Sequence, residues 1–92
     1  MDLAPLARKY IWWQSPETSL KDRHRLVAQV MNIGTYADVQ GLRAALGDDE
    51  FRRVVREARA GEFSERSWHY WHLILELAKP RAVPPLPTRK LA

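Results

Sequence analysis

The segment Arg8–Gln14 constrains the fold most strongly, because it has the composition of a β-strand in a chain whose other patterns are helical. Tyrosine, isoleucine and tryptophan are enriched in strands, and Ser15-Pro16 would end the strand because the residue before a proline avoids the helical region. A lone strand leaves backbone N–H and C=O groups unpaired. We therefore predict that this strand pairs with its equivalent in a second copy, so that the protein is a homodimer. The alternative is that residues 10–13 start a helix or an extended arm.

Four amphipathic helices are predicted after the strand, each opened by a residue whose side chain can cap the first turn. The capping residues are Ser19, Thr35, Asp48 and Ser64, and the helices span residues 20–32, 36–46, 48–59 and 65–78. Gly34 is expected in a left-handed conformation that ends the first helix, and Pro80 ends the last one because proline cannot continue a helix. The predicted fold class is therefore mainly α, with a short N-terminal β-strand followed by four helices.

The 92 residues suffice for one small domain, and 46% of them are hydrophobic, which is typical of a globular chain. We assign residues 1–78 to a single strand-plus-helices domain. Residues 79–92 are predicted to be a basic, flexible tail, because four prolines in eight residues prevent a helix. The absence of cysteine excludes disulfides and thiolate-bound metals. Without an apolar run that could span a bilayer, and without a signal pattern, we expect a cytoplasmic protein that has no contact with membranes.

The net charge of +4 comes entirely from the tail, because Lys and Arg balance Asp and Glu within residues 1–78. A DNA-binding surface on the body must therefore come from local clusters of cations and not from the overall charge.

The order strand, helix, short Gly-Thr turn and helix resembles the ribbon-helix-helix family of DNA-binding regulators over residues 8–46. The resemblance rests on residues 26–39, in which Gly34 and Thr35 separate two apolar-patterned helices. It implies that two copies pair their strands into an antiparallel ribbon that enters the major groove. Alternation places Arg8, Tyr10, Trp12 and Gln14 on the reading face of the ribbon and Lys9 on the opposite face. Arginine can donate twice to guanine, and glutamine can pair twice with adenine.

Seven further cations are predicted to hold DNA phosphates. They are Lys21, Arg23, Arg25, Arg52, Arg53, Arg56 and Arg59. The first three lie near the start of the first predicted helix, where a bound phosphate would compensate their unfavourable interaction with the helix dipole. The alternative is that these three are ordinary solvated charges. The third predicted helix is not expected to read bases, because Asp48, Asp49 and Glu50 would repel phosphate at its N-terminal end.

Over residues 10–77 the chain also resembles a group of small uncharacterised bacterial proteins that are often encoded beside nucleotidyltransferase-like toxin genes. The shared features are Trp12-Trp13, the stretch from Val30 to Gly34, Leu46-Gly47, the stretch from Phe51 to Val55, and Ser64-x-x-Ser67 leading to Trp71. This resemblance implies an antitoxin or a regulator. The leading prediction is thus a transcriptional regulator that binds double-stranded DNA as a homodimer. The alternative is an antitoxin module that binds a toxin protein without DNA.

An enzymatic alternative rests on Arg66 and His72, whose separation by five residues is similar to the Arg-x4-6-His motif of the small helical HEPN ribonucleases. Glu65, His69, His72 and Glu76 also recur at helical spacing and form a stripe that could bind zinc or nickel. The other interpretation of the stripe is a half-exposed helix face with Glu-His contacts. Our prediction is that the protein is not an enzyme and needs neither a cofactor nor a metal.

Overall fold

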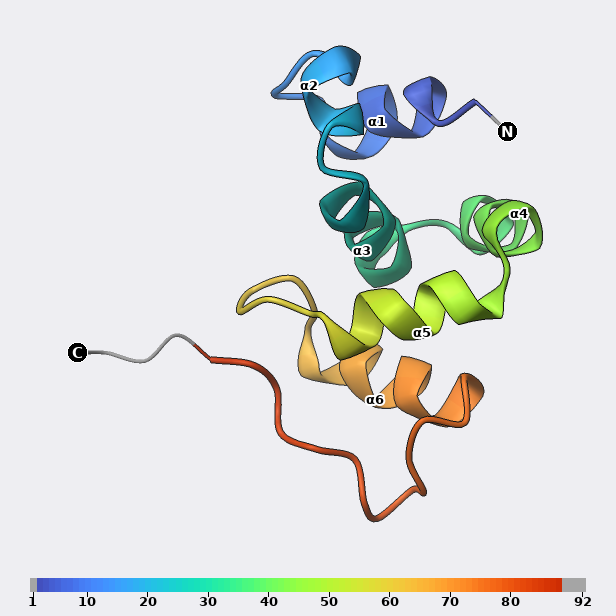
Figure 1. The fold of residues 1–92 in the computed structure, drawn as a ribbon, viewed down its shortest axis with the longest axis vertical. Coiled ribbons are helices and arrows are strands. Elements are labelled where there is room, and N and C mark those ends of the chain that lie inside the picture. The colour runs from blue at the N-terminus through green and yellow to red at the C-terminus, as the bar shows by residue number, and fades with distance from the viewer. Residues whose placement is uncertain (1, 89–92) are drawn as a thin grey trace.

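The computed structural model describes residues 2–88, and this part of the chain is helical, with extended connections but no β-strand (Figure 1). The helices are α1 (Ala4–Tyr10), α2 (Pro16–Leu20), α3 (Arg23–Ile33), α4 (Tyr36–Leu46), α5 (Asp48–Arg56) and α6 (Glu65–Ile74). The predicted N-terminal strand is therefore wrong, and so is the intermolecular ribbon that depends on it. None of the helices described here is long and apolar enough to cross a membrane.

The residues expected to form the strand belong to the end of α1 and to the turn that follows it. Pro5 lies in the first turn of α1, where its fixed φ suits a helix and its missing N–H is not needed. The buried side chains of this region are Leu6, Ala7, Tyr10 and Ile11, which have the spacing of one helix face. The helical pattern thus starts before Arg8, and the alternating burial of a strand does not occur.

Tyr10 connects α1 to the start of α4. Its hydroxyl donates to Asp38 Oδ2 at 2.5 Å and accepts from the Thr35 N–H at 3.0 Å. Lys9 Nζ lies 2.6 Å from the same Asp38 oxygen. The hydrogen bonds from Lys9 and Tyr10 hold the pKa of Asp38 below its ordinary value. These contacts between residues far apart in the sequence fix the N-terminal helix on the body.

We expect Tyr10→Phe to lower the free energy of unfolding by about 1–3 kcal/mol, because it leaves the Thr35 N–H without its acceptor and removes a donor to Asp38. Urea denaturation followed by circular dichroism measures this difference. Tyr36→Phe is the matched control, because Tyr36 is exposed at the start of α4. Equal effects of the two substitutions would contradict the role of Tyr10 as an anchor.

The starts of α4 and α6 are capped as predicted. Thr35 Oγ1 accepts from the Asp38 N–H, and Ser64 Oγ accepts from the Ser67 N–H, each at 3.2 Å. The start of α5 differs from the prediction, because the N-cap position is occupied by Gly47 and not by Asp48. The φ of Gly47 is 87°, a left-handed value that favours glycine.

The first predicted helix, residues 20–32, is divided into two helices. Ser15 caps α2 and Asp22 caps α3, each by accepting a hydrogen bond from a backbone N–H three residues later. Ser19, the predicted cap, is instead buried inside α2. The break occurs at Asp22, whose backbone leaves the helical conformation. Its side chain can then accept a hydrogen bond from the Arg25 N–H in the first turn of α3.

Gly34 ends α3 at a point of close contact. Its φ is −67°, so the predicted left-handed conformation is wrong. A Cβ atom at this position would lie 2.4 Å from the Val30 carbonyl oxygen and 3.1 Å from the Val39 side chain. Glycine is therefore required here by the lack of space between the end of α3 and the start of α4.

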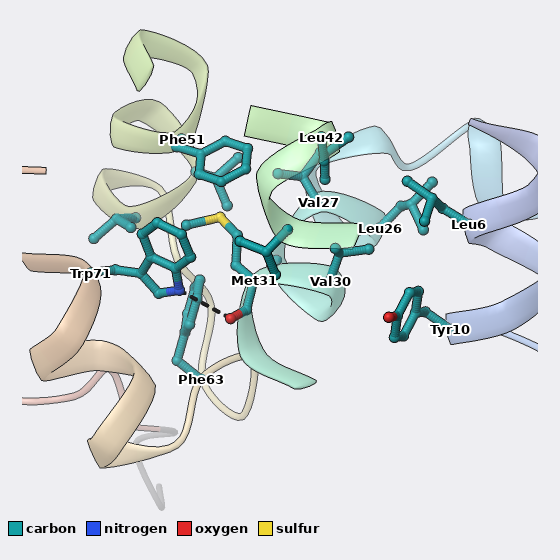
Figure 2. Packing of buried hydrophobic residues seen from close by; sticks show 14 of the residues in the cluster. Leu6, Tyr10, Leu26, Val27, Val30, Met31, Leu42, Phe51, Phe63 and Trp71 are labelled. Atoms are coloured by element: carbon teal, nitrogen blue, oxygen red, sulfur yellow. Dashed lines mark hydrogen bonds between the residues drawn. The ribbon is translucent and has the colours of Figure 1, made fainter. Parts of the chain in front are cut away.

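Helix α3 lies at the centre of the fold and contributes to the core on two sides (Figure 2). Its buried residues are Leu26, Val27, Ala28, Val30 and Met31. Leu6 and Tyr10 of α1 lie on one side, whereas Phe51 of α5 and Trp71 of α6 lie on the other. The indole N–H of Trp71 donates to the Met31 carbonyl at 3.0 Å, and its ring meets Phe51 edge-on. One continuous hydrophobic core thus reaches from α1 to α6.

Helix α6 ends at Ile74, four residues before the predicted end at Ala78. Glu76 adopts a left-handed φ of 56°, and the N–H groups of Leu77 and Ala78 donate to the His72 carbonyl at 2.8 and 3.3 Å. These hydrogen bonds supply donors to a backbone carbonyl in the last turn of α6, so the helix ends and the chain turns before it reaches Pro80.

The extended segment after α6 contacts the body at Val83, Pro84 and Leu86. Trp68 donates its indole N–H to the Pro84 carbonyl at 2.7 Å, and Val83 and Leu86 pack against the hydrophobic core. Residues 89–92, which were also predicted to belong to the flexible tail, lie outside the described residues.

Candidate functional site

The five residues predicted for the ribbon do not form a shared reading face. Arg8, Lys9 and Trp12 are exposed, Tyr10 is buried, and Gln14 is half-buried. Arg8, Lys9 and Tyr10 belong to α1, whereas Trp12 and Gln14 lie in the turn before α2. The face predicted from strand alternation is therefore wrong, because consecutive positions of a helix and a turn do not alternate between two sides.

Four of the seven predicted phosphate contacts form ion pairs with carboxylates of the same chain. The pairs are Arg23–Glu50 at 2.8 Å, Arg52–Asp49 at 2.7 Å, Arg53–Glu50 at 3.7 Å and Arg59–Asp22 at 3.0 Å. Lys21, Arg25 and Arg56 are exposed, and within residues 2–88 they have no carboxylate within ion-pair distance. Much of the positive charge that the sequence places on α5 is thus compensated inside the protein.

Two contacts join the start of α3 to the segment after α5, one an ion pair between Arg59 and Asp22 and the other a hydrogen bond between His24 and Glu62. Arg59 donates to Asp22 from Nη1 at 3.1 Å and from Nη2 at 3.0 Å. This hydrogen bonding lowers the pKa of Asp22 and raises the pKa of Arg59, so both groups stay charged near neutral pH. Glu62 Oε1 lies 2.7 Å from His24 Nε2 and also accepts from the Arg59 N–H at 2.7 Å.

A groove of about 600 Å³ lies beside these contacts, between the turn after α1, helix α3 and the segment after α5. Trp13, Arg25, Gln29, Arg59 and Glu62 are among the residues that line it. The guanidinium carbon of Arg25 lies 5.8 Å from the centre of the Trp13 ring, which is cation–π geometry. An aromatic surface and a cation without a carboxylate partner in the described chain therefore adjoin in one concavity.

A second feature is the outer face of α6, which we define by Tyr70, Leu73 and Ile74. These side chains are 46%, 39% and 42% exposed, and their spacing places them next to each other on the helix. The opposite face of α6 buries Trp68 and Trp71. Helix α6 is thus apolar on two sides, although only one of them faces the core.

A hollow of about 510 Å³ adjoins the outer face of α6, since Leu73 belongs to both. Lys79 and Glu76 line the hollow, and Arg66 lies one turn before Tyr70 on the same helix face. Arg66 and Lys79 are both exposed, so the apolar centre has a cation near each end.

The residues of the enzymatic and metal alternatives are not gathered into one site. Arg66 is exposed, whereas His72 is buried with its Nδ1 atom 2.8 Å from the Trp68 carbonyl oxygen. His69 is exposed, with its Nδ1 atom 3.3 Å from the Glu65 carbonyl oxygen. In the part of the chain that the structure describes, no group of three or more His, Cys, Asp or Glu side chains is placed to hold a metal ion.

No protein-family model matches the chain, and comparisons with curated proteins and with solved structures give no significant match.

Neither surface was singled out by the sequence analysis. The signal for the outer face of α6 is an excess of apolar residues between positions 68 and 77, more than one helix face can bury. The groove has no comparable signal, because its lining comes from three segments that are distant in the sequence.

Proposed function

We propose that this chain is a protein-binding module of the antitoxin type, which holds its partner against the outer face of α6. The observation that carries the proposal is the exposure of Tyr70, Leu73 and Ile74 side by side on one helix face. Contiguous exposed apolar side chains often mark protein-binding surfaces. Fully burying an exposed side chain of this size contributes roughly 1.5–3 kcal/mol. Because these three are already more than half covered, covering the rest contributes less than half of that for each.

The charges beside the outer face of α6 indicate the character of the partner. Arg66 is exposed near one end, and Lys79 lies beside the exposed Glu76 near the other, so a partner with an apolar centre and an acidic group opposite Arg66 would be complementary. The resemblance to proteins encoded beside nucleotidyltransferase-like toxin genes supports a toxin of that class as this partner.

Duplex DNA has less support as the principal partner. Phosphates that approach Arg23, Arg52 or Arg53 would compete with the carboxylates already paired with these side chains. Glu50 and Asp49 would in addition repel the DNA backbone at the start of α5.

The test is a calorimetric titration of the chain with the protein encoded beside its gene. We expect Leu73→Asp to weaken the complex by about tenfold or more, because the new carboxylate would be buried against apolar surface. The matched control is Leu20→Asp, because Leu20 on α2 has the same 39% exposure and lies outside the outer face of α6.

Leu20→Asp should bind the partner like the parent chain. Circular dichroism establishes that both variants keep their helices. Equal affinities of the two folded variants would contradict the assignment of the partner to α6, and a parent chain that does not bind the neighbouring protein would contradict the antitoxin function.

A further inference from the structure

The groove beside Trp13 has the size of a small-ligand site. Its volume of about 600 Å³ falls within the range of roughly 300–1,000 Å³ that such sites occupy. The Arg59–Asp22 ion pair and the hydrogen bond between His24 and Glu62 hold the segment after α5 against the start of α3. The groove is thus shaped by contacts among its own walls and does not depend on the outer face of α6.

Trp13 offers a flat ring that the fold itself uses little. The indole N–H groups of Trp68 and Trp71 donate to backbone carbonyls, whereas that of Trp13 has no acceptor within residues 2–88. Trp13 is 50% exposed, and its ring meets that of Trp12 edge-on at 5.7 Å. Exposed aromatic rings are the platforms on which proteins stack unpaired bases.

Arg25 adds a positive charge beside this ring. Its guanidinium group lies over Trp13, and no carboxylate of the described chain is within ion-pair distance. Contact with an aromatic face orders the arginine side chain and leaves its planar set of N–H donors available. Phosphate oxygens can accept two of these hydrogen bonds at once.

The carboxylates near the groove are already engaged. Asp22 accepts from both terminal nitrogens of Arg59, and Glu62 contacts His24 and the Arg59 N–H. Of the two cations that line the groove, Arg25 and Arg59, only Arg25 has no carboxylate partner within residues 2–88. An anion that enters the groove can therefore bind Arg25 without separating an existing ion pair.

We infer that the groove binds one nucleotide, with the base against Trp13 and the phosphate at Arg25. The ligand has to combine a flat ring with an anion, because the two groups adjoin in one concavity. An acidic side chain of a protein would engage Arg25 but would leave the Trp13 ring uncovered. A base inside a duplex is stacked between its neighbours and cannot reach Trp13, so the nucleotide is free or belongs to a single strand.

Titration of the full chain with AMP, followed by tryptophan fluorescence, tests the inference. Stacking of adenine on Trp13 should produce a saturable quench. Affinities of variants are measured by the anisotropy of a fluorescently labelled single-stranded oligoadenylate and by calorimetry with AMP, because these signals do not require Trp13.

We expect Trp13→Leu and Arg25→Ala each to weaken nucleotide binding by about tenfold or more, since one removes the stacking surface and the other the phosphate contact. Arg25→Lys should fall between the parent and Arg25→Ala, because lysine keeps the charge but not the planar donors. Arg81→Ala removes an exposed arginine from the segment after α6 and should bind like the parent. Trp13 and Arg25 are exposed, so circular dichroism should show all four variants folded.

The source of the nucleotide and the competing ligand classes are separated by the same titrations. Binding of AMP alone supports a site for free nucleotides, and tighter binding of oligoadenylate supports a site for single strands. Inorganic phosphate that competes as well as AMP would overturn the inference in favour of a simple anion site. Displacement of AMP by a glutamate-rich peptide at lower concentration would overturn it in favour of a protein ligand, as would unchanged nucleotide affinity in both Trp13→Leu and Arg25→Ala.

Discussion

Replacing Trp71 with alanine should lower the free energy of unfolding by about 3–5 kcal/mol, a large part of the roughly 5–15 kcal/mol that stabilises a typical domain. Trp71 is one of the largest fully buried side chains, packs edge-on against Phe51, and donates to the Met31 carbonyl. Alanine would leave a cavity between α3 and α6 and a buried carbonyl without its donor. Urea denaturation followed by circular dichroism measures the loss.

Two further tryptophan variants separate the causes of this effect. Trp71→Phe keeps most of the apolar volume and removes the N–H donor, so we expect a smaller loss of about 1–3 kcal/mol. Trp12→Ala removes a ring that is 76% exposed in the turn after α1 and should change stability by less than about 0.5 kcal/mol. A loss at Trp12 as large as that at Trp71 would contradict the burial pattern of the fold.

The second large effect is expected at Gly34. Gly34→Ala should destabilise the protein by about 1–3 kcal/mol, because the new Cβ would lie 2.4 Å from the Val30 carbonyl oxygen and neither backbone can yield easily. The end of α3 and the start of α4 would have to move apart. Thermal and urea denaturation of the variant and the parent measure the difference.

Gly41→Ala is the matched control for this substitution. Gly41 lies inside α4, and a Cβ there would meet nothing within 4 Å. Alanine at this position should raise the free energy of unfolding by about 0.5–1 kcal/mol, because it favours the helix over the unfolded chain. Stabilisation by both substitutions would show that the contact at Gly34 is not restrictive.

The capped helices were the predictable part of the fold. Thr35 and Ser64 each precede an apolar helical pattern, and the structure confirms both starts. These signals are local, since a cap and its first turn lie within four residues of each other. The end of α6 was not predictable in this way, because a non-glycine residue, Glu76, adopts the left-handed conformation that closes the helix.

The N-terminal segment shows how a local pattern fails. The aromatic and β-branched run from Tyr10 to Trp13 has strand composition, but Leu6 and Ala7 place the preceding residues on a helix face that continues through Ile11. Packing against α3 decided the conformation, and composition did not. Trp12 and Trp13 then lie in a turn, which explains why these large side chains remain exposed.

The candidate sites were less predictable than the fold, because they depend on tertiary contacts. Arg25 was among the predicted phosphate contacts, but its position over Trp13 could not follow from the sequence. Arg59 and Asp22 are 37 residues apart, and their ion pair compensates one of the charges that sequence clustering suggested was available to DNA. Charge counts along a chain do not reveal which cations are already paired in the fold.

The central position of α3 has a consequence for the cooperativity of the protein. Because one flank of this helix completes the core with α1 and the other completes it with α5 and α6, neither the first three helices nor the last three contain a whole core. Either fragment would expose to water apolar side chains that the intact chain buries. The chain is thus a single folding unit with no internal boundary at which it could be divided.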